Sequence, residues 1–149
     1  MLIYITVIII VIIFDQVTKF LTTLFLKPLG SVPIVQNVLH LTYSENTGAA
    51  FSMLRDRQLL LIVISGLAMV GFVVYLFKWS QRPGQHWQKL CFAFIIGGGI
   101  ANLIDRIRLS YVVDMIDFRL INFAIFNIAD SFITVGAIGL LALILLNVD

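Results

Sequence analysis

The sequence predicts an all-α membrane protein, a bundle of four membrane-spanning helices. Its 149 residues are 60% hydrophobic and only 12% charged, whereas soluble domains usually carry about 25% charged residues. Four apolar segments approach the roughly 20 residues that a helix needs to cross the hydrocarbon core. These runs lack the period-2 alternation of a β-barrel, the other backbone arrangement that lipid tolerates. At this length we expect a single domain over residues 1–149.

The four expected spans differ in their polar content. The first contains Asp15 and Lys19, the second contains no charge, the third is short and rich in glycine, and the fourth carries Asp130 near its start. The first span lacks the basic start and the small-residue cleavage site of a signal peptide, so we interpret it as a retained helix. The spans are expected at about residues 2–26, 59–77, 88–105 and 128–148.

The connections are of two kinds. Residues 27–57 contain Pro28, Gly30 and Pro33, followed by LHLTYS (39–44), whose alternation predicts a short strand. Residues 78–89 form a short basic loop flanked by tryptophans, which is typical of a membrane interface. Residues 106–127 form a second long connection of mixed charge. Four spans place both termini on one side, but the Lys and Arg counts of the connections do not decide which side.

Composition excludes several classes of function. A net charge of +2 is too small to indicate nucleic-acid binding. Cys91 is the only cysteine, so no internal disulfide can form. His40 and His86 lie far apart without the spacing of metal ligands, so we predict no metal site.

Charged residues inside a span are costly and need an explanation. Asp15 and Lys19 lie four residues apart on the first helix, where they can form an ion pair on one face. We interpret this pair as structural, since a matched pair holds both charges fixed. Asp105 and Arg106 are most simply a charge pair at the end of the third helix.

The third span combines small residues with an amide. Gly97–Gly99 are expected to allow close packing of neighbouring helices. Asn102 lies near the end of the same helix, where lipid offers its amide no hydrogen-bond partner. It must therefore bond to another protein group, which makes it a candidate for organising a site.

Two acidic motifs are the sharpest features. Asp114 lies in SYVVDMIDF (110–118), and Asp130 lies in FNIADSF (126–132). Asp130 could cap the last helix, and Asp114 could be a solvated loop acid or pair with Asp117. The residues alone leave these interpretations open beside catalysis.

A turn-like segment, ENTGAAFS (45–52), precedes the second span. Asn46 and Gly48 suit a tight or left-handed backbone, and an ordinary loop is equally compatible with them.

Together these segments resemble the bacterial lipoprotein signal peptidases, a family of intramembrane aspartyl peptidases. The resemblance covers almost the whole chain. Its five motifs occur in the family's order and spacing: FDQVTK (14–19), ENTGAAFS (45–52), GGGIANLIDR (97–106), YVVDMIDF (111–118) and FNIADSFI (126–133).

The resemblance implies that Asp114 and Asp130 are the catalytic pair of an aspartic-type endopeptidase. Eight further positions are implied to bind substrate or organise the site: Asp15, Lys19, Asn46, Gly48, Asn102, Asp105, Arg106 and Asn127. Ala101, Ser110 and Met115 depart from the family's pattern, and we expect them to affect substrate fit more than chemistry.

The implied activity is removal of signal peptides from prolipoproteins, with cleavage before a diacylglyceryl-modified cysteine. The resemblance further implies a monomer in the bacterial cytoplasmic (inner) membrane, in contact with lipid, needing no metal or cofactor and inhibited by cyclic peptides of the globomycin type. Residues 27–57 would form a small extracytoplasmic β-structured platform, and 106–127 a loop or helix covering the site. Both termini and residues 78–89 would face the cytoplasm.

In such an enzyme two neighbouring carboxylates share one proton, so that one acts as base and the other as acid. The sequence does not assign these two roles. A small transporter or proton-relay subunit would also explain intramembrane acids, but it predicts acids spread through the depth of the bilayer. A non-enzymatic assembly protein would tolerate asparagine in place of the loop acids.

Overall fold

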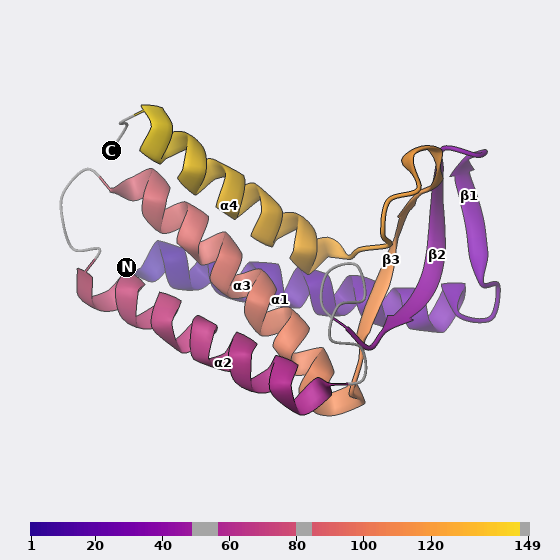
Figure 1. Ribbon diagram of the computed structural model, residues 1–149, viewed down its shortest axis with the longest axis horizontal. Helices are drawn as coiled ribbons and strands as arrows, with labels where there is room; N and C mark the ends of the chain where they lie inside the picture. The colour runs from indigo at the N-terminus through magenta and orange to yellow at the C-terminus, as the bar shows by residue number, and fades with distance from the viewer. Residues whose placement is uncertain (49–56, 80–84, 147–149) are drawn as a thin grey trace.

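The computed structural model describes residues 1–48, 57–79 and 85–146. In this part of the chain four helices are long and apolar enough to cross a membrane, as the four expected spans require (Figure 1). They are α1 (Leu2–Leu21, continued by a π-helix over Thr22–Leu26), α2 (Gln58–Val74, continued by a π-helix over Tyr75–Trp79), α3 (His86–Leu109) and α4 (Ile128–Leu146). The third helix extends beyond the expected 88–105 at both ends.

Helix α3 is the central element of the bundle, and it packs against each of the other three helices. Gly97–Gly99 face Val11 of α1, Ala129 of α4 and Met69 of α2, in that order. A methyl group on the second of these glycines would lie 2.5 Å from the Ala129 carbonyl oxygen. The expectation that these glycines allow close helix packing is therefore confirmed.

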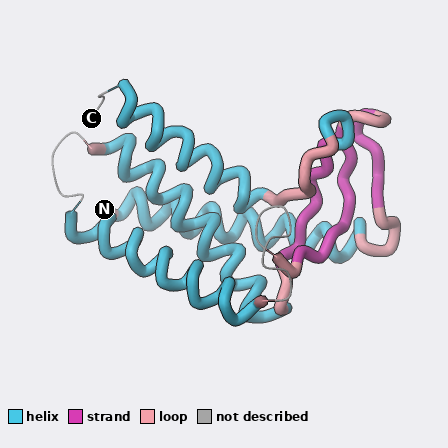
Figure 2. The backbone as a smooth tube through the Cα atoms, in the orientation of Figure 1, coloured by secondary structure: helices cyan, strands magenta, loops and turns pink. Residues whose placement is uncertain are grey.

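A three-stranded antiparallel sheet lies at the end of the bundle where α3 ends and α4 begins (Figures 1 and 2). Its strands are β1 (Ser31–Val35), β2 (Leu39–Asn46) and β3 (Val112–Phe118), in that order. Strand β2 confirms the strand predicted at 39–44, and β1 with β2 confirms the β-structured platform.

The connection over residues 106–127 contains the expected loop and a short 3-10 helix, η4 (Arg119–Ile121), but it also includes the end of α3 and a strand. Helix α3 continues to Leu109 and ends at Ser110, whose φ of 65° is a left-handed conformation that glycine adopts without strain. Strand β3 follows and joins the platform. The strand carries no period-2 signal because both of its faces are covered, so that Val112–Met115 are all buried.

Three parts of the sequence predictions lie outside the described residues. They are 49–52 of the ENTGAAFS segment, 80–84 of the basic loop, and 147–148 of the fourth span.

Candidate active site

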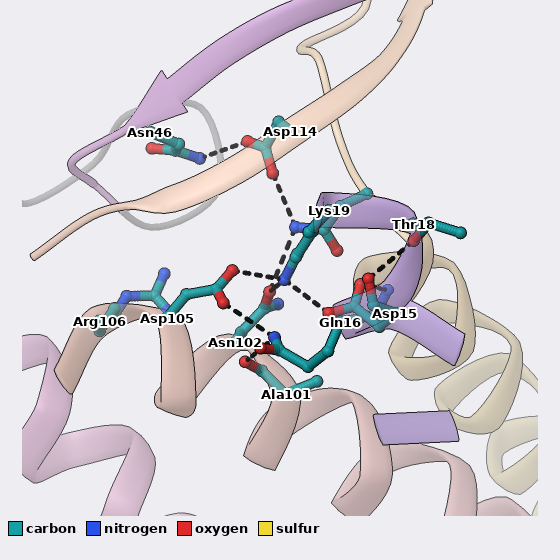
Figure 3. A network of polar contacts seen from close by, with 12 residues as sticks. Asp15, Gln16, Thr18, Lys19, Asn46, Ala101, Asn102, Asp105, Arg106 and Asp114 are labelled. Carbon is teal, nitrogen blue, oxygen red and sulfur yellow. Dashed lines mark hydrogen bonds and ion pairs between the residues drawn. The ribbon is translucent and has the colours of Figure 1, made fainter. Parts of the chain in front are cut away.

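A buried cluster of charges joins α1 to α3 at the end of the bundle near the sheet. The predicted ion pair is confirmed, since Lys19 Nζ lies 2.7 Å from Asp15 Oδ2. The same ammonium lies 2.8 Å from Asp105 Oδ2 (Figure 3). Asp15 also accepts a hydrogen bond from the backbone N–H of Ala129 at 2.8 Å, which attaches α1 to the first turn of α4.

Asp105 and Arg106 do not form the expected charge pair at a helix end. Asp105 is buried, and besides pairing with Lys19 it accepts a hydrogen bond from Gln16 at 2.8 Å. Arg106 instead donates to the carbonyl oxygen of Gly48 at 3.1 Å. Consecutive residues on a helix point in different directions, so the two side chains reach different neighbours.

The start of α4 is capped by Asn127. Its Oδ1 accepts the backbone N–H of Asp130 at 2.9 Å, and Asp130 Oδ2 accepts the backbone N–H of Asn127 at 3.3 Å. This reciprocal arrangement is a capping box. Asp130 therefore lies in the first turn of the helix. The interpretation of Asp130 as the N-cap is wrong, because Asn127 takes that position.

Asp114 is held on β3 by two side-chain amides. Asn46 Nδ2 donates to its Oδ2 at 3.0 Å, and Asn127 Nδ2 donates to its Oδ1 at 2.7 Å. The orientation of the first amide follows from the turn after β2, because Asn46 Oδ1 accepts the backbone N–H of Gly48 at 2.9 Å. Both amides thus present N–H groups to this carboxylate.

Asp130 receives a third amide. Asn102 Nδ2 donates to Asp130 Oδ1 at 2.8 Å. Asn102 Oδ1 in turn accepts hydrogen bonds from Lys19 Nζ at 2.8 Å and from Asn127 Nδ2 at 3.2 Å. The contact between the two asparagines links the surroundings of the two candidate catalytic carboxylates.

The environment of Asp114 favours its protonated form. The side chain is 1% exposed. Burial is the largest effect and the negative charge of Asp130 the second, and together they raise the pKa of Asp114 to about 7. The hydrogen bonds from Asn46 and Asn127 act in the opposite direction but are outweighed. A carboxyl group with this pKa can hold a proton near neutral pH.

Both carboxylates border one cavity of about 870 Å³. Its polar wall includes Asn46, Asn102 and Arg106. Its apolar wall is formed by the segment after β3 and by the first two turns of α4, with Phe123, Ile125, Phe126, Ile133 and Val135. Of the connection over 106–127 that was expected to cover the site, the residues that line this cavity are Arg106, Val112, Asp114 and 123–126. Ala101, Ser110 and Met115, the three departures from the family pattern, are not among the lining residues.

Asp117 belongs to a different network. It accepts hydrogen bonds from Thr42 Oγ1 at 2.7 Å and from Arg119 Nε at 2.9 Å. Burial raises its pKa, but these two partners outweigh burial and the pKa of Asp117 is lowered. The interpretation that pairs Asp114 with Asp117 is therefore wrong, because residues three apart on a strand point to opposite faces.

All ten residues singled out from the sequence lie in this one region, contributed by α1, the end of β2, α3, β3 and the start of α4. Gln16 was missed, although the argument applied to Asn102, that an amide in an apolar helix needs a partner, would have found it. The clustering of Asp15, Asp105, Asp114 and Asp130 at one end of the bundle does not fit a proton relay spread through the bilayer.

Comparisons with known proteins identify the family of this chain. Residues 7–146 match the family model of signal peptidase (SPase) II. A lipoprotein signal peptidase of Caldanaerobacter subterraneus subsp. tengcongensis is 48% identical over 86% of each chain. Those of Streptococcus pyogenes serotype M1 and Clostridioides difficile are 45% and 42% identical, over 85% and 93% of this chain and 82% and 92% of theirs.

Solved structures agree as well. Two structures of a bacterial membrane enzyme, each 30% identical in sequence, superpose with TM-scores of 0.86 and 0.84. Each covers 95% of this chain, and the matched regions are 87% and 92% of those chains. The chain therefore belongs to the signal peptidase II family and is a multi-pass membrane peptidase.

Proposed function

We propose that this protein removes signal peptides from bacterial prolipoproteins as an aspartic-type endopeptidase, with Asp114 and Asp130 as its catalytic pair. The observation that carries the proposal is the shared cavity: two carboxylates, each fixed by amide donors, border the same space. The names of the relatives supply the substrate class.

The two carboxylates are proposed to divide the roles of base and acid. Asp130 is the ionised member, because it accepts hydrogen bonds from Asn102 and from the backbone N–H of Asn127. It also lies in the first turn of α4, where the helix dipole favours negative charge. Asp114 is the protonated member, in agreement with its raised pKa of about 7. This division rests on one proton shared by a coupled pair.

Hydrolysis then proceeds in two proton-balanced steps. Asp130 takes a proton from water as the water oxygen bonds to the scissile carbonyl carbon, while Asp114 gives its proton to the carbonyl oxygen. When the resulting diol collapses, the carbonyl returns its proton to Asp114, and the proton on Asp130 goes to the departing amine. The C–N bond breaks in this step, and the pair regains its single shared proton.

The cavity suits a substrate that is partly peptide and partly lipid. The Arg106 guanidinium lies on the polar wall, where it can donate to peptide carbonyl oxygens. The apolar wall from Phe123 to Val135 suits the acyl chains of a diacylglyceryl-modified cysteine. We infer that a cyclic peptide inhibitor of the globomycin type would occupy the same cavity.

We further propose that the sheet and the cavity face the outside of the bacterial inner membrane, with both termini in the cytoplasm. The sheet and the catalytic pair lie at the same end of the bundle, and signal peptides are cut on the outer face. The protein is proposed to act as a monomer, because one chain supplies both carboxylates and all the amides that hold them.

The substrate class is tested with purified protein and a pair of prolipoproteins. One carries the diacylglyceryl-modified cysteine, and the other has serine in place of that cysteine and cannot be lipidated. We expect cleavage of the first alone, with the modified cysteine as the new N-terminus in mass spectrometry. Equal cleavage of both would reject lipoprotein specificity, and cleavage of neither would reject the activity.

A further inference from the structure

The orientation of each asparagine at the site is fixed by a donor bound to its amide oxygen. Two of the three are oriented by backbone N–H groups, those of Gly48 and Asp130. Asn102 differs, because its oxygen accepts from two side chains, Lys19 at 2.8 Å and Asn127 at 3.2 Å. The orientation of this one amide can therefore be altered by substituting another residue.

The ammonium group of Lys19 is buried among three oxygen-bearing side chains. The side chain is 4% exposed, and its nitrogen lies within 2.8 Å of one oxygen each of Asp15, Asp105 and Asn102 (Figure 3). An ammonium group has three donors and no acceptor. The Lys19 ammonium donates a hydrogen bond to the Asn102 amide oxygen and is ion-paired with the two carboxylates. The amide of Asn102 must therefore turn its oxygen toward Lys19.

This orientation decides what Asn102 presents to the catalytic pair. With its oxygen directed at Lys19, its Nδ2 donates to Asp130 Oδ1 at 2.8 Å. A flipped amide would place its oxygen against Asp130, where it could be satisfied only by a protonated carboxyl group. It would also bring its NH₂ group toward the NH₂ group of Asn127, which now donates to the Asn102 oxygen at 3.2 Å.

We propose that Lys19 is a positioning residue: by fixing the amide of Asn102 it presents an N–H group to Asp130 and holds that carboxylate as the ionised member of the pair. This inference rests on the proposed aspartyl mechanism and goes beyond a structural ion pair. The charged groups that act on Lys19 are Asp15 on α1, Asp105 on α3 and Asp114 on β3. The catalytic pair is in turn close to Arg106 on α3, which interacts electrostatically with Asp114 and with Asp130 on α4.

The test is the pH profile of cleavage by Lys19→Met, which removes the ammonium group but keeps a long unbranched side chain. We expect kcat to fall about 10- to 100-fold, as for loss of one hydrogen bond to a charged group. The acidic limb of kcat/KM should move to higher pH, because the ionised carboxylate has lost a fixed donor. A purely structural role would change the folded fraction without moving this limb.

Two variants complete the design. Tyr4→Phe removes the 2.8 Å hydrogen bond between the Tyr4 hydroxyl and His86 Nδ1, which joins the start of α1 to the start of α3. It should lower thermal stability while leaving the acidic limb in place. If Lys19→Met does not fold, Lys19→Met with Asp105→Asn keeps the net charge of the cluster and carries the same expectation.

A second measurement tests whether Lys19 acts through Asn102. The kcat of Lys19→Met combined with Asn102→Ala should be no lower than that of Asn102→Ala alone, because the amide to be oriented is already gone. Additive losses, or an unmoved acidic limb in a folded and active Lys19→Met protein, would overturn the positioning role. Wild-type protein that does not cleave lipidated prolipoprotein would instead reject the proposed function, so the two failures are distinguishable.

Discussion

The Asp15 carboxylate accepts the backbone N–H of Ala129 across 114 residues of sequence, at 2.8 Å. Ala129 precedes Asp130 in the first turn of α4. A side chain of the first helix therefore helps to place a candidate catalytic residue of the last. The same carboxylate is paired with Lys19, so the charge balance of this cluster and the position of α4 are linked.

This link predicts how the charged cluster responds to substitution. Lys19→Ala alone leaves Asp15 and Asp105 buried without their shared cation, and breaking a buried pair costs roughly 3–5 kcal/mol. Lys19→Ala combined with Asp15→Asn leaves one fewer unpaired acid. The single variant should therefore show a lower Tm and a lower yield in detergent than the double variant. Equal Tm values would indicate that the burial of these acids costs little.

The glycines of α3 provide a matched pair of packing variants. A methyl group at position 98 would lie 2.5 Å from the Ala129 carbonyl oxygen, which belongs to the backbone and can yield only if α4 moves. A methyl group at Gly99 would meet the flexible end of Met69. Gly98→Ala should therefore reduce both Tm and cleavage strongly, because it displaces the turn that carries Asp130, whereas Gly99→Ala should be much milder. The reverse order would show that α4 is not positioned by this contact.

The environment of Asp114 predicts a pH-dependent stability. Burial and the charge of Asp130 raise its pKa to about 7 in the folded protein, above the ordinary value of 3.8. The folded state thus binds this proton more tightly than the unfolded state, so the contribution of Asp114 to stability is complete below about pH 4 and is lost as pH rises to about 7. Asp114→Asn should remove this contribution. Its Tm relative to wild type should rise between pH 4 and pH 8, and parallel curves would contradict the raised pKa.

The proposed orientation in the membrane predicts two labelling results. In a background where Cys91 is replaced by alanine, Gln36→Cys on the exposed turn after β1 should react with an impermeant thiol reagent added to intact cells. Gln85→Cys, just before α3, should react only after the membrane is opened. The opposite pattern would place the sheet and the cavity in the cytoplasm.

The parts of the fold that the sequence predicted are those set by local composition. Helices long enough to cross the membrane need only a sustained apolar run, and the strand at 39–44 has the alternation of a half-buried strand. Strand β3 lacks that alternation because its two faces are both buried, so the residues alone did not predict a strand there.

In the site, too, the local ion pair could be predicted and the contacts between elements could not. The pairing of Asp15 with Lys19 is local and could be predicted from their spacing. The pairing of Lys19 with Asp105 joins two helices, and it depends on how α3 packs against α1. The capping by Asn127 was missed because the polar residues around the start of α4 offer several possible caps, and only the observed helix start at Ile128 selects one.

The central claim is that Asp114 and Asp130 are the catalytic pair, and it is tested by asparagine substitution with a neighbouring acid as control. Asp114→Asn and Asp130→Asn should each fold and bind lipidated prolipoprotein but cleave it about a thousandfold more slowly or not at all, because the pair loses its acid or its base. Asp117→Asn makes the same substitution at an aspartate three residues further along β3. Asp117 belongs to the separate network with Thr42 and Arg119, so this variant should retain substantial activity. Single-turnover cleavage of the lipidated substrate is the measurement. Near-normal cleavage by Asp130→Asn, or an Asp117→Asn protein as inactive as Asp114→Asn, would contradict the assignment.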